Sequence, residues 1–236
     1  MSKEVFKEGL DILGLELSEQ KIESFFKYKE LVLEWNKRLN LTAICDDKEF
    51  VIKHFLDSLT VLKYLGKIKG RLIDVGTGAG FPGIPLKIAV DNLDVSLLDS
   101  LEKRVKFLDN VINDLDLKNI HAMHSRAEDA GNDGNYRENY DFCVSRAVAS
   151  LPVLCEYCLP FVKVNGLFLA MKALKSSEID DSKRALEILG GKVEDVIDFT
   201  LPLTDNNRKI IMIRKFRQTP TKYPRKSGKP SKNPLL

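Results

Sequence analysis

The sequence of 236 residues has no long hydrophobic run and few residues of the kind that form disulfide networks. No segment reaches the roughly 20 consecutive apolar residues that a membrane-spanning helix needs. Its four cysteines follow no spacing typical of a disulfide framework, which favours a reducing compartment. Acidic residues (Glu4, Glu8 and Asp11) interrupt the first positions, where a secretory signal is apolar. We therefore expect a cytoplasmic protein that does not enter a membrane.

The chain has only three histidines, and its histidines and cysteines do not form a recognisable metal motif. Cys155 and Cys158 form a single CxxC, but their spacing also fits a buried helix face rich in leucine. His121 and His124 lie on one predicted strand, with no further Cys or His to complete a ligand set. The sequence therefore predicts no metal site, and it places these cysteines, together with Cys143, in the core.

Acidic residues are absent from the last part of the chain. Residues 206–236 contain ten Lys and Arg and no Asp or Glu, whereas the preceding part is net acidic. Four of the nine prolines also lie there: Pro220, Pro224, Pro230 and Pro234. A basic segment interrupted by prolines is typical of an extended arm that binds a polyanion, and equally of a solubilising tail without a partner. We expect an extended basic tail whose partner the composition leaves open.

Hydrophobic periodicity divides the remaining sequence into a helical part and an alternating part. Residues 19–40 carry apolar side chains at three-and-four spacing after a possible N-cap at Ser18, and a second helix is predicted at 51–65. Strands are predicted at 71–75, 95–99, 119–124, 140–145, 166–171, 193–203 and 209–214. Helices are predicted between them, near 82–91, 101–115, 151–161 and 178–189. This alternation is typical of a doubly wound α/β sheet with parallel strands, which binds its ligand at the carboxyl ends of the strands.

These patterns suggest three parts. We expect an N-terminal helical extension at residues 1–66, a doubly wound α/β domain at residues 67–215 and a basic, proline-rich C-terminal tail at residues 216–236.

The stretch LIDVGTGAGFPGIPL (residues 72–86) places Gly76, Gly78 and Gly80 directly after the first predicted strand. Glycine permits positive φ angles and lets a ligand approach the backbone closely. A G-x-G-x-x-G pattern that begins two residues later would suit a dinucleotide, but it includes Pro82, which has no N–H for a pyrophosphate. The G-x-G-x-G pattern led by Asp74 fits S-adenosylmethionine, which carries no phosphate.

Further candidate residues follow the next three strands. Asp99 can accept hydrogen bonds from two ribose hydroxyls, or it can cap the following helix. In HSRAED (residues 124–129), the backbone N–H of Ala127 and the side chain of Glu128 can bind the edge of an adenine. Arg146 ends the fourth strand, where a guanidinium can anchor a carboxylate, a phosphate or a purine. Together these residues predict a nucleoside-bearing cofactor, either S-adenosylmethionine or NAD.

Six stretches carry a resemblance to one family: LEWNKRLNLTA (33–43), HFLDSL (54–59), LIDVGTGAGFPGIPL, LLDSLEKRVKFL (97–108), SRAED and SRAVASL (145–151). In this order they resemble the small-subunit ribosomal RNA guanine-N7 methyltransferases, also called glucose-inhibited division protein B. The resemblance covers nearly the whole chain. It implies a Rossmann-like class I methyltransferase sheet and transfer of the methyl group of S-adenosylmethionine to N7 of a guanine in 16S ribosomal RNA. By motif, it assigns cofactor contacts to Gly76, Phe81, Ala127, Glu128 and Arg146.

The implied reaction needs alignment of the reactants more than acid–base chemistry. Guanine N7 has an in-plane lone pair and no proton at neutral pH, so no general base is required, and we expect Arg146 to act by positioning. Predicted contacts with 16S ribosomal RNA or the small-subunit particle fall on Lys103, Arg104, Lys172, Arg225 and Lys226. His54 and Asp57 share a helix face and are candidates for RNA contact or for packing. Ala173 departs from the family, which tends to have glycine there. We expect a monomer.

Two alternatives remain open from the residues themselves. The same fold could serve an NAD-dependent oxidoreductase, which would bind NAD and not S-adenosylhomocysteine. The tail and the helical part could also belong to a non-catalytic RNA-binding assembly factor, which would tolerate replacement of Gly76 and Arg146.

Overall fold

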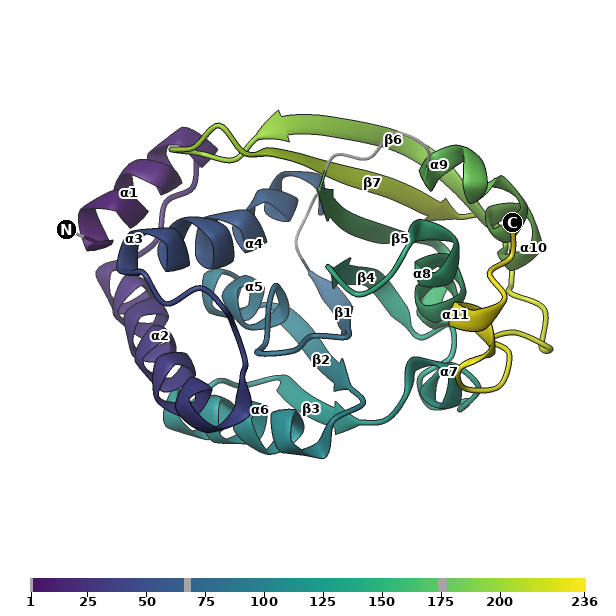
Figure 1. The fold of residues 1–236 in the computed structure, drawn as a ribbon, viewed down its shortest axis with the longest axis horizontal. Helices are drawn as coiled ribbons and strands as arrows, with labels where there is room; N and C mark the ends of the chain where they lie inside the picture. Colours follow the sequence, from purple (N-terminus) through teal and green to yellow (C-terminus); the bar gives the residue numbers. More distant parts are fainter. Residues whose placement is uncertain (1, 66–68, 174–177) are drawn as a thin grey trace.

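A sheet of seven strands lies at the centre of the computed structural model, which describes residues 2–65, 69–173 and 178–236 (Figure 1). The strands are β1 (Gly70–Val75), β2 (Leu93–Asp99), β3 (Ile120–His124), β4 (Tyr140–Arg146), β5 (Val162–Ala173), β6 (Gly191–Thr200) and β7 (Asn207–Lys215). They are arranged in the order β3-β2-β1-β4-β5-β7-β6. The seven predicted strands and the α/β fold class are thus confirmed. The predicted domain boundary at residues 66–67 lies outside the described residues.

The sheet is parallel from β3 to β5, and β7 runs antiparallel between β5 and β6. The link between β6 and β7 is short, and so short a connection joins antiparallel neighbours only. The order of strands reverses direction between β1 and β4. At such a switch point the loops after the two strands diverge and leave room for a ligand.

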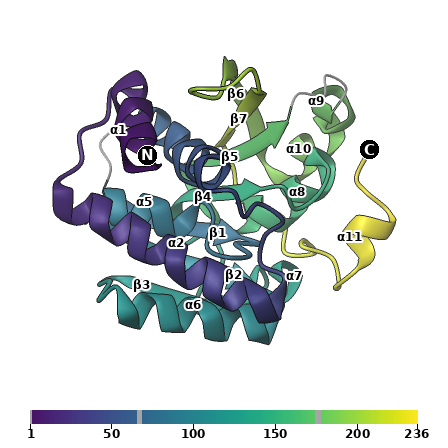
Figure 2. The same ribbon diagram turned by 60° about the vertical axis from the view of Figure 1, so that its left-hand side comes forward.

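Helices cover both faces of the sheet (Figures 1 and 2). The α-helices are α1 (Ser2–Leu13), α2 (Glu19–Leu39), α3 (Asp47–Phe50), α4 (Asp57–Leu59), α5 (Gly83–Ala89), α6 (Glu102–Asp114), α7 (Ala127–Ala130), α8 (Leu151–Cys158), α9 (Glu178–Asp181), α10 (Lys183–Leu189) and α11 (Lys229–Lys232). A π-helical turn, η1 (Val51–Leu56), and two 3₁₀ turns, η2 (Thr60–Tyr64) and η3 (Leu159–Phe161), complete the set. No described helix is both long and apolar enough to cross a bilayer.

The structure can be compared with the two helices that the sequence predicts in the N-terminal part. The helix after Ser18 is confirmed as α2, and the Ser18 hydroxyl accepts a hydrogen bond from the backbone N–H of Lys21. The helix predicted at 51–65 is confirmed as a helical segment, but its hydrogen-bonding pattern changes along it, so that it is divided into η1, α4 and η2. The division matters because η1 and the start of α4 carry His54 and Asp57, and π-helical turns occur frequently at functional sites.

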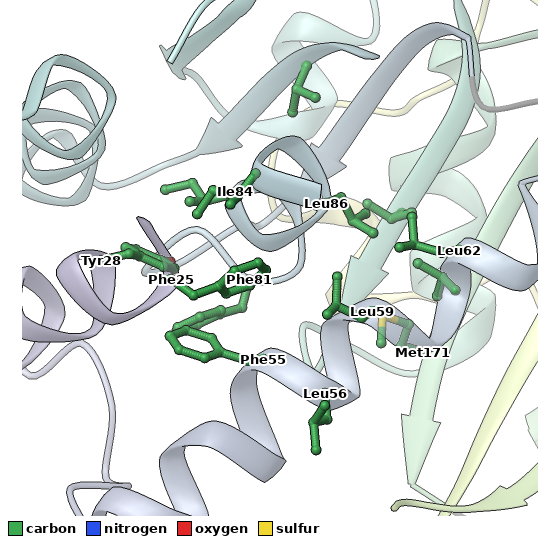
Figure 3. Packing of buried hydrophobic residues seen from close by; sticks show 14 of the residues in the cluster. Phe25, Tyr28, Phe55, Leu56, Leu59, Leu62, Phe81, Ile84, Leu86 and Met171 are labelled. Carbon is green, nitrogen blue, oxygen red and sulfur yellow. The ribbon is translucent and has the colours of Figure 1, made fainter. Parts of the chain in front are cut away.

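Each face of the sheet has its own hydrophobic cluster. Neighbouring strand residues alternate between them, so Leu72 packs with the N-terminal helices, α5 and α6, and Ile73 packs with α7, α8 and α10. On the first face, aromatic rings of the N-terminal helices contact the glycine loop. Figure 3 shows Tyr28 and Phe55 beside Phe81, with ring centroids 5.3 and 6.4 Å from that of Phe81. The N-terminal helices therefore support the loop that follows β1.

The C-terminal segment (residues 216–236) folds back against α7 and α8 (yellow in Figure 1). The Arg225 guanidinium forms a two-pronged ion pair with Glu156, which is fully buried on α8. The Tyr223 side chain is buried, and the Arg137 guanidinium donates hydrogen bonds to several backbone carbonyls of the segment. The predicted extended arm is therefore wrong. A buried carboxylate on α8 and these backbone contacts give the basic segment partners within the protein.

Candidate active site

The loop after β1 is held by backbone hydrogen bonds to the end of β2. The N–H groups of Gly76 and Thr77 donate to the carbonyl of Leu98, at 2.9 and 3.1 Å. Gly76 has a φ of +73°, and a Cβ at this position would lie 2.6 Å from Cγ2 of Val148. Glycine is therefore required here both by conformation and by the close approach of the loop that follows β4.

The Asp74 carboxyl is buried below this loop and is only half satisfied. Its Oδ2 accepts hydrogen bonds from the Thr77 hydroxyl at 2.7 Å and from the Gly83 N–H at 2.8 Å. Its Oδ1 is buried and has no hydrogen-bond partner among the described residues. Burial raises the pKa of Asp74 to about 6, against the effect of these hydrogen bonds, which lower it. A buried carboxylate oxygen without a donor is suited to a cationic or hydrogen-bond-donating ligand group.

A cleft of about 130 Å³ opens at the carboxyl ends of β1, β2 and β3, and we call it the glycine-loop cleft. It is lined by Val75, Gly76, Leu98, Asp99, Ser100, Ser125, Arg126, Ala127, Glu128, Val148 and Tyr157. Four of the predicted cofactor residues, Gly76, Asp99, Ala127 and Glu128, are thus brought together.

The other four predicted cofactor residues, Gly78, Gly80, Phe81 and Arg146, do not line this cleft, and their cofactor contacts stay predictions. Gly80 has a packing reason to be glycine, because a Cβ there would meet the side chains of Ile84 and Tyr28.

Asp99 connects three neighbouring segments at one side of the cleft. Its Oδ2 accepts the N–H of Gly78 at 2.9 Å and lies 3.4 Å from the Arg104 guanidinium. Its Oδ1 accepts the N–H of Leu101, the N-cap residue of α6, at 2.9 Å, and it therefore supports the turn before the helix. The neighbouring Lys103 side chain is exposed on α6. No side chain of the described residues caps α6, so Asp99 is not a helix cap, and its contact with a ligand stays a prediction.

Arg146 lies at the end of β4 and faces away from the glycine-loop cleft. Its Nη1 donates to Oδ2 of Asp57 at 2.7 Å and to the Lys53 carbonyl at 3.0 Å. The second oxygen of Asp57 accepts from Nε of Arg208 at 3.1 Å, so one buried carboxylate binds two arginines. The Arg146 guanidinium also lies over the ring of Phe81, 5.3 Å from its centroid. Its position is therefore fixed from several sides.

His54 completes this cluster as a neutral side chain. Its ring stacks on Phe81 at 4.3 Å with an interplanar angle of 6°. Nδ1 lies 3.3 Å from Nη2 of Arg146, and Nε2 lies 2.8 Å from the Thr42 hydroxyl. Because Arg146 can only donate, Nδ1 accepts and the ring proton lies on Nε2. Burial and the Arg146 charge lower the pKa of His54 to about 3, so His54 carries no positive charge at neutral pH.

A second hollow of about 480 Å³ lies on this side of β4, and we call it the Arg146 cavity. It is lined by Ile44, Lys53, His54, Asp57, Arg146, Ala147, Met171, Lys172, Ala173, Glu178, Phe199, Arg208, Lys209 and Ile210. Lys172, a predicted RNA contact, donates to the Ala149 carbonyl at 2.5 Å and pairs with Glu178 at 2.8 Å. The cavity is thus rich in cations, several of which are already paired.

The two hollows adjoin at the end of β4. Arg146 and Ala147 line the Arg146 cavity, and the next residue, Val148, lines the glycine-loop cleft. Ala147 has a φ of +57°, a backbone conformation that is uncommon for a residue with a side chain. Residues 146–148 are thus the boundary between the two hollows.

Several residues of the site had no usable signal in the sequence. Arg208 binds Asp57 across 151 positions of the chain, and nothing near either residue indicates the pairing. Tyr157 lines the glycine-loop cleft and Glu178 lines the Arg146 cavity, and the sequence around each has the pattern of an ordinary packed helix.

The cysteines lie where the sequence placed them. Cys143, Cys155 and Cys158 are buried, and burial raises the pKa of Cys155 far above its usual value. Among the described residues, no group of three or more His, Cys, Asp or Glu could hold a metal ion.

The fold and both hollows can now be compared with known proteins. Residues 21–211 match the family model of rRNA small subunit methyltransferase G, GidB. A protein named ribosomal RNA small subunit methyltransferase G from Acetivibrio thermocellus is 60% identical over 97% of this chain and 94% of its own. A protein of the same name from Alkaliphilus oremlandii is 51% identical over 99% of this chain and 98% of its own. The chain belongs to the GidB family. The resemblance carried by the six sequence stretches is thereby confirmed.

Solved structures show that the GidB-family chain has a methyltransferase fold. A SAM dependent methyltransferase from Aquifex aeolicus aligns with a TM-score of 0.54 at 19% identity, covering 74% of this chain and 96% of its own. TYW2 from M. jannaschii, in complex with AdoMet, aligns with a TM-score of 0.51 at 16% identity, covering 69% and 76%. At these identities the likeness establishes the fold, and it confirms the predicted Rossmann-like class I methyltransferase sheet.

Proposed function

We propose that this protein transfers the methyl group of S-adenosylmethionine to N7 of a guanine in 16S ribosomal RNA. The proposal rests on membership of the GidB family and on one structural observation, the junction of the glycine-loop cleft and the Arg146 cavity at the end of β4. A methyl donor and a methyl acceptor need neighbouring sites, and two hollows lined by consecutive residues of one turn support this assignment.

The glycine-loop cleft has the groups that S-adenosylmethionine requires. We assign the ribose to Asp99, the adenine edge to Ala127 and Glu128, and close backbone contact to Gly76. Asp74 lies below the loop and outside the lining of the cleft, and we assign the ammonium of the amino-acid part to the side of its Oδ1, which has no partner among the described residues. When bound, the cofactor supplies a methyl group that its sulfonium has already activated.

We assign the guanine to the Arg146 cavity. Guanine presents an acceptor at O6, which suits a hollow lined by Lys53, Arg146, Lys172 and Arg208. N7 carries a lone pair and no proton, so the reaction asks no residue to remove one. His54 is neutral and Arg146 is held by Asp57, and both therefore orient the base without exchanging protons. Arg146 acts as a positioning residue in this assignment.

Some of the remaining predicted RNA contacts are exposed cations, and others form ion pairs within the protein. Lys103 and Lys226 are exposed, and we propose that they contact phosphates. Arg104 forms an ion pair with Asp99, and Arg225 forms one with Glu156, so these two charges are partly neutralised within the protein. We propose 16S RNA or the small-subunit particle as substrate, a cytoplasmic location and a monomeric enzyme.

Methyl transfer to RNA from a strain that lacks the enzyme tests this function. The wild-type protein should incorporate tritium from labelled S-adenosylmethionine into 16S RNA or small subunits, and chemical cleavage at N7-methylguanine should locate the label. The Arg146→Ala variant should bind S-adenosylhomocysteine and transfer little label. Absence of incorporation into both substrates by the folded wild-type protein would overturn the proposal. Binding of NAD in preference to S-adenosylhomocysteine would point instead to an oxidoreductase.

A further inference from the structure

The C-terminal segment reaches the glycine-loop cleft through one backbone group. The N–H of Gly228 donates a hydrogen bond of 2.8 Å to Oε1 of Glu128, a residue 100 positions earlier in the chain. Glu128 lines the cleft and is only 4% exposed. Gly228 precedes α11 and has a φ of +80°, which directs its N–H toward α7. A segment expected to lie free in solvent therefore contacts the cofactor side of the protein.

The C-terminal segment that carries Gly228 is attached to α7 and α8 by further contacts. Besides the Arg225–Glu156 ion pair, the Asn132 amide donates both to the Glu128 carbonyl at 2.8 Å and to the Pro224 carbonyl at 3.1 Å. One side chain thus binds α7 and the segment together. The helices α7, α8 and α11 lie side by side in Figure 1. Gly228 is consequently presented to Glu128 by the attachment of the residues that precede it, Pro224 and Arg225.

The Glu128 carboxylate is left with one oxygen for a ligand. Among the described residues, the N–H of Gly228 is the one hydrogen-bond donor to this carboxylate, and Oε2 has none. A side-chain carboxylate that is bound at one oxygen loses rotational freedom, so its other oxygen is fixed in direction before a ligand arrives. An exocyclic amine, which has two N–H donors, matches that free oxygen.

We infer that the C-terminal segment positions Glu128, through Gly228, to distinguish adenine from bases that lack an amine at the same place. This inference rests on the proposed function, because it places the cofactor's adenine at Glu128. It makes Gly228 a positioning residue and gives the basic segment a task on the cofactor side that does not depend on RNA.

The inference is tested by the binding of two nucleosides to the full-length protein. S-adenosylhomocysteine carries the amine, and S-inosylhomocysteine has a carbonyl oxygen in its place. We expect the wild type to prefer the first by about tenfold or more, the range of a hydrogen bond to a charged group. In Gly228→Pro the donor N–H is gone, and the preference should fall by about fivefold. Calorimetry at a fixed salt concentration gives both dissociation constants.

Gly228→Ala is the matched control, because it is strained at a φ of +80° as Gly228→Pro is, but it keeps the N–H and its Cβ has no neighbour within 4 Å. It should keep most of the preference. Removal of residues 227–236 takes away the donor and two lysines, and Lys229→Ala/Lys232→Ala takes away the same charge alone. The truncation should reduce the preference as Gly228→Pro does, whereas the double lysine variant should not. Thermal unfolding checks that each variant is folded.

The ratio of the two dissociation constants separates positioning from general support. If the segment only stabilises the fold, its loss would weaken the binding of both nucleosides equally and leave the ratio unchanged. The inference is overturned if the wild type shows no preference, or if Gly228→Pro or the truncation, whichever is folded, keeps the wild-type ratio. If the folded wild type binds neither nucleoside, the proposed function itself fails.

Discussion

The glycine-loop cleft and the Arg146 cavity lie on either side of the end of β4, yet they are built in different ways. The cleft takes its lining from residues 75–157, mostly from the ends of three strands that neighbour one another in the sheet. The cavity takes its lining from residues 44–210 and combines the N-terminal helices with β4, β5, β6 and β7. The first is a product of local turns, and the second exists only after the N-terminal helices have packed on the sheet.

The two hollows also differ in how their charges are satisfied. In the cavity, Asp57 is bound by two arginines, which offset the cost of burying its charge. Below the glycine loop, Asp74 is fully buried, its burial raises its pKa, and one of its oxygens has no partner among the described residues. The buried acid of the cavity is therefore paired at both oxygens, whereas the buried acid below the glycine loop is paired at one.

The largest expected effect is the loss of stability when the buried acid of the Arg146 cavity is removed. Asp57→Ala leaves Arg146 and Arg208 without their buried partner, and it should lower the free energy of unfolding by about 3–5 kcal/mol. Urea unfolding monitored by circular dichroism measures the loss. Where the variant is still folded, its affinity for S-adenosylhomocysteine should stay close to wild type. A loss below about 1 kcal/mol, or an equal loss of cofactor affinity, would contradict the separation of the two hollows.

The next effect is the pH dependence of stability that follows from Asp74. The folded protein holds the Asp74 proton up to about pH 6, whereas the unfolded chain releases it near the usual value of 3.8. The folded state binds more protons in that window, so stability falls as the pH rises through it. Compared with Asp74→Asn, the wild type should lose about 2–3 kcal/mol between about pH 4 and pH 7.

His54 titrates with the opposite sign. Its pKa is about 3 in the folded protein against 6.5 when unfolded, so it lowers stability as the pH falls through that range. Its contribution is common to the wild type and to Asp74→Asn and cancels in their difference. Unfolding free energies of both proteins over the same pH series provide the comparison. Parallel curves for the two proteins would show that Asp74 does not carry the raised pKa.

A smaller effect separates two glycines of the same loop. Gly76 and Gly78 both have positive φ, but a Cβ at Gly76 would meet Val148, and a Cβ at Gly78 would meet nothing within 4 Å. Alanine should therefore cost stability at both positions because of the positive φ, and more at Gly76, where it should also reduce affinity for S-adenosylhomocysteine by about tenfold more than at Gly78. Titration calorimetry on both variants decides this. Equal affinities would mean that Val148 moves away without cost.

The smallest effect is on the salt dependence of RNA binding. Each phosphate neutralised on a single strand contributes about 0.7 to the slope of log affinity against log salt. Lys103→Ala and Lys226→Ala should each make the slope shallower by about that amount. Lys118 pairs with Asp116 before the amino end of β3, whereas the glycine-loop cleft lies at the carboxyl ends of the strands, and Lys118→Ala serves as the control. Unchanged slopes for both variants would remove these two lysines from the RNA surface.

The sequence predictions were accurate for the strands and the glycine-loop cleft and failed for contacts between distant parts of the chain. Strand positions came from short-range alternation of apolar residues, and Gly76, Asp99, Ala127 and Glu128 meet because parallel strands end at one edge of the sheet. The tail prediction failed because composition cannot show a buried partner. Glu156 lies within an otherwise apolar helix, and a single buried acid there gave no sign that Arg225 would reach it.

The sequence by itself determined the order of strands and helices, the need for glycine after the first strand and the family to which the chain belongs, because each depends on residues close together in the chain. Only the tertiary structure decided that Asp57 joins Arg146 to Arg208, and that Gly228 touches Glu128. Those contacts connect side chains and backbone groups 89 to 151 positions apart, and such pairings are fixed by how whole layers pack, not by any local pattern.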